Sequence, residues 1–124
     1  MKRALLMLTL CAAACSPNDA APQPGNLTLT LPSAGGNDGA VVLVISGGPV
    51  TSVTPLQGSQ AATNVDGAGT HVMIVGNLTA GAIATIAVPD VSRATAYVAT
   101  VEQVSDRSTF ALLDPVHYRV AISR

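Results

Sequence analysis

Apolar and polar residues alternate in residues 26–31, NLTLTL, so that three leucines fall on one side and two threonines on the other. A period of two is typical of a strand with one buried face. Residues 40–45, AVVLVI, are apolar throughout, rich in β-branched side chains and bounded by Gly39 and Gly47. This pattern predicts a central strand covered on both faces, and it is the best candidate for the core strand.

Five further segments have the composition of strands, and turn-forming residues separate them. They are residues 50–54, 71–75, 82–88, 95–103 and 116–123. After the short Gly-Gly-Pro connection, the first of them is expected to be the hairpin partner of the core strand or a bent continuation of it. Residues 76–81 have glycine at each end and are expected to form the turn between the second and the third.

The last predicted strand has a clear alternation. Tyr118, Val120 and Ile122 are expected to face the core, and the residues between them, His117, Arg119 and Ser123, to face solvent. Near the end of residues 95–103 the alternation changes phase at Val104, where we expect a bulge.

Two segments have no clear strand pattern. Residues 56–69 are rich in Gly, Ser, Asn and Gln, and they form either a mobile loop or a loose edge strand. Residues 108–113 are expected to form one helical turn before Asp114 and Pro115.

Seven short strands without a convincing helix predict an all-β fold, a small antiparallel β-sandwich covering residues 26–124. The segments AVVLVISGGPVTSV and AIATIAVPD resemble the immunoglobulin-like and cohesin-like sandwiches of bacterial envelope proteins. This resemblance implies a fold and transfers no ligand-binding residue.

The first fifteen residues, MKRALLMLTLCAAAC, have the order of an export signal: two basic residues, an apolar run, three alanines and a cysteine. Their end resembles the lipobox of bacterial lipoproteins, which implies cleavage between Ala14 and Cys15 and acylation of Cys15. Residues 1–14 would then be the signal peptide and residues 15–25 a flexible, lipid-anchored tether. The alternative is an ordinary secretory signal with an incidental cysteine. Cys11 is less favoured because Leu10 before it is too large.

The apolar run is about ten residues long, and a helix that crosses a membrane needs roughly 20, so we expect no transmembrane helix. Attachment to the membrane would therefore depend on the lipid. Ser16, rather than aspartate, follows the candidate lipid cysteine, and by the same resemblance this implies the outer membrane. Both cysteines lie in residues 1–15, which leaves the domain without an internal disulfide or a thiolate metal site.

Charge excludes one class of partner. From Cys15 onwards the chain has four arginines, no lysine and seven acidic residues, so its formal charge is −3. Without a basic cluster, no nucleic acid is expected as a partner.

The motifs of catalysis and metal binding are missing from the sequence. His71 and His117 are widely separated, and no closely spaced ligands accompany them. The aspartates mostly lie beside Gly, Pro or Ser, as turn-forming residues do, and no G-x-S-x-G is present. We therefore predict no catalytic, cofactor-binding or metal-binding residue and no cofactor.

Three functions remain. The most favoured is a structural or protein-interaction module with a cell-envelope partner, which would bind through loops and strand edges, residues 56–69 above all. A glycan-binding module is the alternative, and an exposed pair of rings would favour it. An enzyme is the least favoured, and a cleft that gathers a histidine with two carboxylates would favour it.

Acylation of Cys15 gives the first prediction. Intact-mass spectrometry of the membrane-extracted protein is expected to show loss of residues 1–14 and a diacylglyceryl-modified Cys15. A Cys15→Ser variant should lose its partition into detergent. An unmodified Cys15, or a Cys15→Ser protein that still partitions into detergent, would contradict the prediction.

Overall fold

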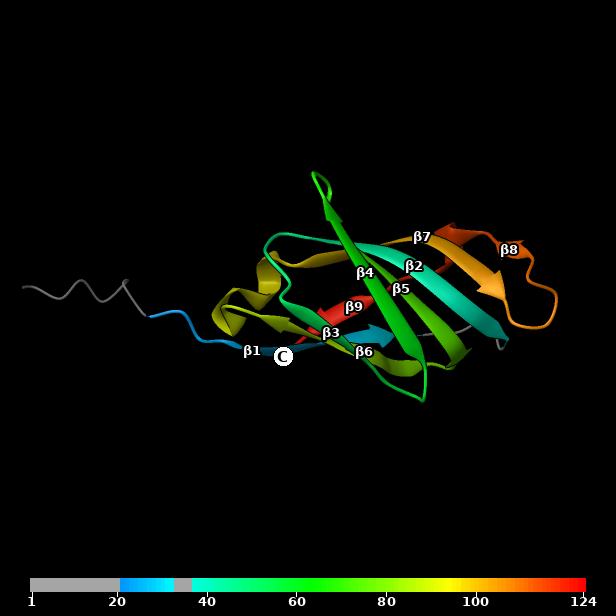
Figure 1. Ribbon diagram of the computed structural model, residues 1–124, viewed down its shortest axis with the longest axis horizontal. Helices are drawn as coiled ribbons and strands as arrows, with labels where there is room; N and C mark the ends of the chain where they lie inside the picture. The colour runs from blue at the N-terminus through cyan, green and yellow to red at the C-terminus, as the bar shows by residue number, and fades with distance from the viewer. Residues whose placement is uncertain (1–20, 33–36) are drawn as a thin grey trace, which may run out of the picture.

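The computed structural model describes residues 21–32 and 37–124, and in them two antiparallel sheets pack face to face (Figure 1). This confirms the predicted all-β sandwich. The cleavage residue Ala14, the lipidation residue Cys15 and the tether as far as residue 20 lie outside the described residues. Within the described residues, no helix is long and apolar enough to cross a membrane.

The first sheet has the strand order β3-β6-β1-β9, and the second has the order β4-β5-β2-β7-β8. The strands of the first sheet are β1 (Gly25–Leu31), β3 (Ser52–Pro55), β6 (Gly81–Val88) and β9 (Ala121–Ser123). Those of the second are β2 (Asp38–Ser46), β4 (Gln60–Asp66), β5 (Gly69–Leu78), β7 (Val98–Asp106) and β8 (Leu112–Leu113). Two short 3₁₀ helices, η1 (Val91–Ala96) and η2 (Pro115–His117), complete the described elements.

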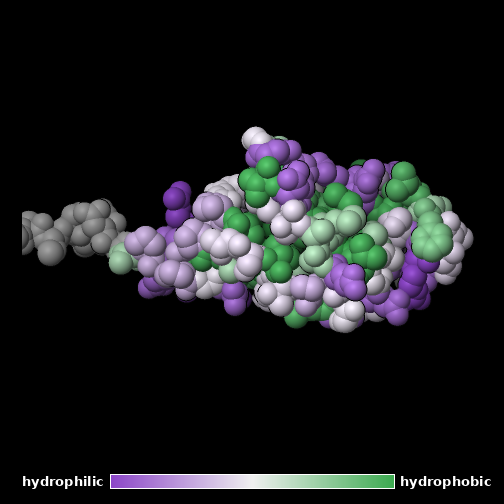
Figure 2. All heavy atoms as spheres, in the orientation of Figure 1, coloured by the Kyte–Doolittle hydropathy of each residue, from purple (hydrophilic) through white to green (hydrophobic). Residues whose placement is uncertain are grey.

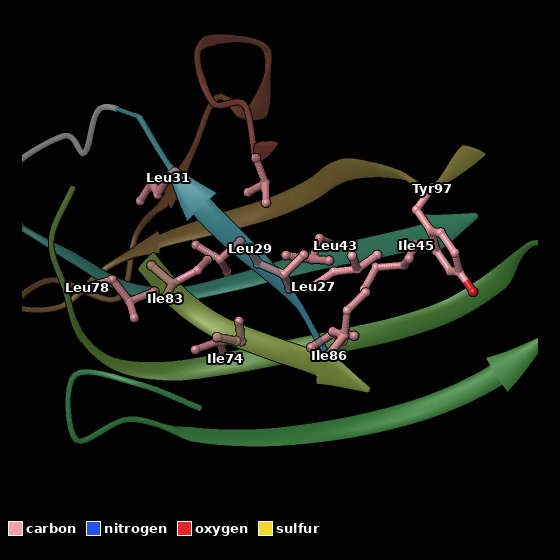
Figure 3. Packing of buried hydrophobic residues seen from close by; sticks show 14 of the residues in the cluster. Leu27, Leu29, Leu31, Leu43, Ile45, Ile74, Leu78, Ile83, Ile86 and Tyr97 are labelled. Carbon is pink, nitrogen blue, oxygen red and sulfur yellow. The ribbon is translucent and has the colours of Figure 1, made fainter. Parts of the chain in front are cut away.

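Leucine and isoleucine side chains from both sheets meet in a single layer between them (Figure 3). Leu27, Leu29 and Leu31 of β1 are fully buried, as the alternation predicted, and they face Leu43 and Ile45 of β2. Isoleucines of β5 and β6 fill the space around them. This layer is the core of the sandwich.

The central strand differs from its prediction in one respect. β2 does lie in the middle of its sheet, and Val41, Leu43 and Ile45 are fully buried. Val42 and Val44, however, remain partly exposed on the other face. The expectation that both faces are covered is therefore wrong, because no second layer packs against this side of the sheet in the described residues.

The predicted turn at residues 76–81 is present but shorter, since β5 ends at Leu78 and β6 begins at Gly81. Residues 50–54 are neither the hairpin partner of the core strand nor a continuation of it. β3 pairs with β6 in the first sheet rather than with β2, and β5 and β6 belong to different sheets. Residues 47–51 and the connection after Leu78 therefore cross between the sheets. Gly47 allows the first crossing, since its φ is +100° and a Cβ there would collide with the carbonyl oxygen of Ala96. The hydrophobic period of a segment predicts a strand, but it does not predict which sheet that strand joins.

Residues 56–69 contain the edge strand β4, so the edge-strand alternative is confirmed. Residues 108–113 form a loop and β8, and the helical turn expected there is wrong. The carboxylate of Asp106 explains this loop, because it accepts hydrogen bonds from the backbone N–H groups of Ser108 (2.8 Å) and Thr109 (2.9 Å). The expected bulge falls two residues early: Val42 pairs with Gln103 and Leu43 with Val101, which leaves Glu102 as the extra residue.

Both ends of the core are closed by tyrosines. The Tyr97 hydroxyl donates to the carbonyl oxygen of Pro49 at 2.8 Å, and the Tyr118 hydroxyl donates to Oδ1 of buried Asp38 at 2.9 Å. Val120 is buried and Ile122 half-buried, which confirms the predicted inward alternation of the last segment, although only Ala121–Ser123 is a strand.

Two leucines give a matched test of the core. Leu43→Ala removes a fully buried side chain, and we expect it to lower the free energy of unfolding by about 2–5 kcal/mol. Leu112 is 71% exposed, and Leu112→Ala should cost under about 0.5 kcal/mol. Urea unfolding followed by circular dichroism measures both, and equal losses would show that the inner face of β2 is wrongly assigned.

Candidate interaction surface

The outer face of the second sheet carries a group of exposed apolar side chains (Figure 2). We call this group the apolar face. It consists of Ala40, Val42, Met73, Val75, Phe110 and Leu112. Met73 and Val75 are each 44% exposed, and Phe110 is 80% exposed.

Strand register gathers these residues. Val42 pairs with Met73 and Ala40 with Val75, so the four side chains point to the same side of β2 and β5. Ala40 and Leu112 both pair with Ser105 of β7, which extends the group to the end of the sheet. The apolar face therefore draws on β5, β2, β8 and the loop before β8, while β7 contributes polar Gln103 and Ser105 between them.

The outer face of the first sheet is different. Its exposed and half-exposed positions are mainly hydroxyl residues, namely Thr28, Thr30, Ser52, Thr54, Thr85 and Ser123. This is the usual composition of a sheet face in contact with water. The valine and methionine side chains on the outer face of the second sheet are therefore a local feature, and the overall composition of the chain does not explain them.

Phe110 is presented by a strained loop. Its φ is +58°, a region that bulky residues rarely adopt, and its backbone N–H donates to the carbonyl oxygen of Asp106 at 3.0 Å. The Asp106 N–H in turn donates to the carbonyl oxygen of Ala111 at 2.9 Å. These two backbone hydrogen bonds fix the loop in the conformation that exposes the ring.

Asp106 also ties this loop to the start of β2. Asn37 Nδ2 donates to both carboxylate oxygens of Asp106 at 3.2 Å, and Arg107 Nη2 donates to Asn37 Oδ1 at 2.9 Å. Hydrogen bonds from the backbone N–H groups of Thr109 and then Ser108 hold the pKa of Asp106 below its usual range, since they favour the charged carboxylate.

Two small hollows lie on the apolar face. One has a volume of about 220 Å³ between Ala40, Val75 and Phe110, and the other, of about 190 Å³, lies between Val42, Met73 and Leu112. Each is below the size typical of small-molecule sites. They suit single side chains of a protein partner better than a whole ligand.

An open groove of about 680 Å³ lies between β7 and the chain around η2. Asp114 and Arg119 are the charged residues of its lining, and Asp114 caps η2 by accepting from the Val116 N–H at 3.0 Å. Asp114 is thus engaged in local structure. The groove gathers no set of catalytic side chains.

The structure does bring one histidine together with two carboxylates. His71 Nε2 lies 2.7 Å from Asp66 Oδ2, and His71 Nδ1 lies 3.4 Å from Glu102 Oε2. A hydrogen bond from the Ala68 N–H and then the contact with His71 lower the pKa of Asp66. All three side chains are exposed in part, so they form a cluster on the surface.

Other candidate chemistry stays dispersed. His117 belongs to η2, and the described ranges 21–32 and 37–124 hold no group of three or more His, Cys, Asp or Glu suited to a metal ion. Tyr97 is buried and Tyr118 half-buried, which leaves Phe110 as the one strongly exposed ring of the three in the chain. The described residues therefore offer no pair of exposed rings on which a sugar could stack.

Sequence reasoning missed the apolar face, although a signal for it was present. The uninterrupted apolar run of residues 40–45 marked a strand with two apolar faces.

No protein-family model matches the chain, and comparisons with curated proteins and with solved structures gave no match. The functional argument therefore depends on the surface itself.

Asp106 gives a pH prediction. Because its pKa is lower in the folded protein than in the unfolded chain, its contribution to stability is complete above the unfolded value of about 3.9 and is lost as the pH falls through the folded value. Urea unfolding between pH 7 and pH 2 should show this loss, and Asp106→Asn should lower stability at pH 7 and flatten the acid dependence. An unchanged acid dependence in Asp106→Asn would contradict the assignment.

Proposed function

We propose that this protein is a lipid-anchored cell-envelope protein whose sandwich is a structural or protein-interaction module. In this proposal Cys15 carries the lipid, the outer membrane holds it, and the apolar face binds another envelope protein. The observation that carries the proposal is the contrast between the two outer sheet faces. Hydroxyl residues predominate on one, whereas on the other valine, methionine, leucine and phenylalanine lie among polar side chains such as His71 and Gln103.

Water contact makes such a face unfavourable in an isolated domain. Burial of apolar side chains lowers the free energy of the system. Exposed groups of such side chains mark interaction sites in soluble domains. Polar side chains lie beside the apolar ones: Asp106 and Arg107 line the hollow at Phe110, and Gln103 lines the hollow at Leu112. Apolar contacts mixed with polar groups are usual in protein–protein interfaces.

Phe110 is the natural anchor of this surface. A large, strongly exposed ring on a loop fixed by hydrogen bonds loses little conformational freedom when a partner covers it. Aromatic residues are among those that contribute most to binding at interfaces. The strain at its φ of +58° is consistent with a position kept for contact rather than for folding.

The position of the apolar face fits an anchored module. Residues 21–24 leave the sandwich at the end that holds η1, and the loop before β8 lies at the opposite end (Figure 1). Gln23 is fastened there, since its carbonyl oxygen accepts from the Val91 N–H at 2.8 Å. A lipid on Cys15 would therefore direct the Phe110 loop away from the membrane.

Anchoring also compensates for a small binding surface. Proteins confined to the same membrane meet at a high effective concentration, so an interface that is weak in solution can still be occupied. The seven residues 16–22, between Cys15 and the fastened Gln23, could span roughly 24 Å at full extension, which would let the domain search its surroundings.

Site-specific cross-linking tests this function. A photo-reactive phenylalanine analogue at Met73, in the acylated protein in its own membranes, is expected to capture a discrete protein. The matched control is the same analogue at Thr54 on the hydroxyl face, which should capture none. Met73→Glu should abolish capture by an analogue placed at Leu112, because the hollow between the two residues then holds a charge. Equal capture at Met73 and Thr54, or none at either, would overturn the proposal.

A further inference from the structure

The described part of the sandwich has four edge strands, and they differ in how well they resist pairing with another chain. β8 has two residues and β9 has three, too few for a stable ladder. β3 has four and ends at Pro55, which has no backbone N–H. The stretch of β7 that β8 leaves uncovered lies next to η2, across the open groove described above.

β4 has none of these protections. It contains seven residues, QAATNVD, and its register with β5 is uninterrupted by a bulge. It includes no proline, lysine or arginine, and its single charge, Asp66, is at its end. In an antiparallel ladder alternate residues direct their N–H and C=O groups away from the neighbour, so half of these groups point outward from the sheet edge.

Val65 is an exposed apolar residue on the inner side of β4. It pairs with buried Thr70, so its side chain is on the inner side of the sheet, yet it is 69% exposed. The end of the β4–β5 hairpin projects past the body of the sandwich (Figure 1), which leaves Val65 without a cover. Ala61, on the same side of β4, is half-buried against the core.

We propose that β4 pairs with β4 of a second copy of this chain, antiparallel and centred on Thr63. In this register Val65 of each copy lies opposite Ala61 of the other, and Thr63 lies opposite itself. Asp66 lies opposite Gln60, whose amide suits a carboxylate. All seven residues are used, and the exposed valine gains an apolar neighbour next to the core of the second copy.

Charge selects this arrangement. A parallel pairing of two β4 strands in register would place Asp66 beside Asp66, whereas the antiparallel one separates the two carboxylates by the length of the strand. The antiparallel arrangement is also a closed two-fold dimer, in which each copy uses the same surface. Nothing on the strand opposes a like charge in this register.

Dimerisation would join the second sheets of two copies into one continuous sheet of ten strands. The outer side of β4, with Ala62 beside Met73, becomes the junction between the two apolar faces. This inference stands on the edge strand and does not depend on the proposed envelope partner.

Charge exchange at the symmetry axis tests the dimer. The full chain with Cys11 and Cys15 both replaced by serine is compared with its Thr63→Lys and Thr63→Asp variants by analytical ultracentrifugation. The parent is expected to show a reversible monomer–dimer equilibrium. Each variant should associate at least about tenfold more weakly, because like charges meet at the axis. An equimolar mixture of the two variants should recover the dimer, since lysine then faces aspartate.

Thr54→Lys, on the edge strand of the other sheet, is the matched control and should leave the equilibrium unchanged. Recovery in the mixture also shows that both variants are folded, and a disulfide between two Thr63→Cys chains would locate the axis. A parent that stays monomeric at several hundred micromolar overturns the proposal and leaves the edge to a different chain. Single variants that dimerise like the parent, or a mixture that does not recover, overturn it as well.

Discussion

The apolar layer between the two sheets is the interaction on which the rest of the structure depends. Residues after Cys15 contain no cysteine, so no disulfide holds the domain, and leucine and isoleucine packing must offset the chain entropy. Tyr97 and Tyr118 close the two ends of this layer through hydrogen bonds to Pro49 and Asp38. Loops and edges can then be strained or open, because the layer fixes the strands that carry them.

β2 connects this core to the surface. Its inner residues, Val41, Leu43 and Ile45, are fully buried, and its outer residues belong to the exposed apolar face. A strand that only had to fold would need one apolar face, as β1 shows with its alternating threonines. In the proposed function, the second apolar face of β2 serves for contact with another molecule.

Much of this fold was predictable from the sequence. The strand alternation of β1, the central position of β2 and the inward face of Val120 and Ile122 follow from local periodicity. Sheet membership did not, because Ser52–Pro55 and Gly81–Val88 find partners far along the chain, and nothing local encodes that choice. The sequence does not distinguish loop from strand at β4 for a related reason: an edge strand with few buried side chains has no hydrophobic period. The apolar face was missed because a two-sided apolar strand has the same pattern whether its second side is covered or open.

The open edge and the apolar face belong to one physical problem. An unprotected strand edge and exposed valines both favour association, and in a freely diffusing protein they would favour uncontrolled aggregation. In the described residues, the edge strands β3, β8 and β9 are short, and β3 ends at Pro55. These features limit pairing with another strand at those edges. Exposed large apolar side chains are most numerous on β4 and the outer face of the second sheet, although Val116 of η2 is exposed as well. A lipid anchor would restrict encounters to the vicinity of a membrane, so that two small surfaces could associate without strong affinity in solution.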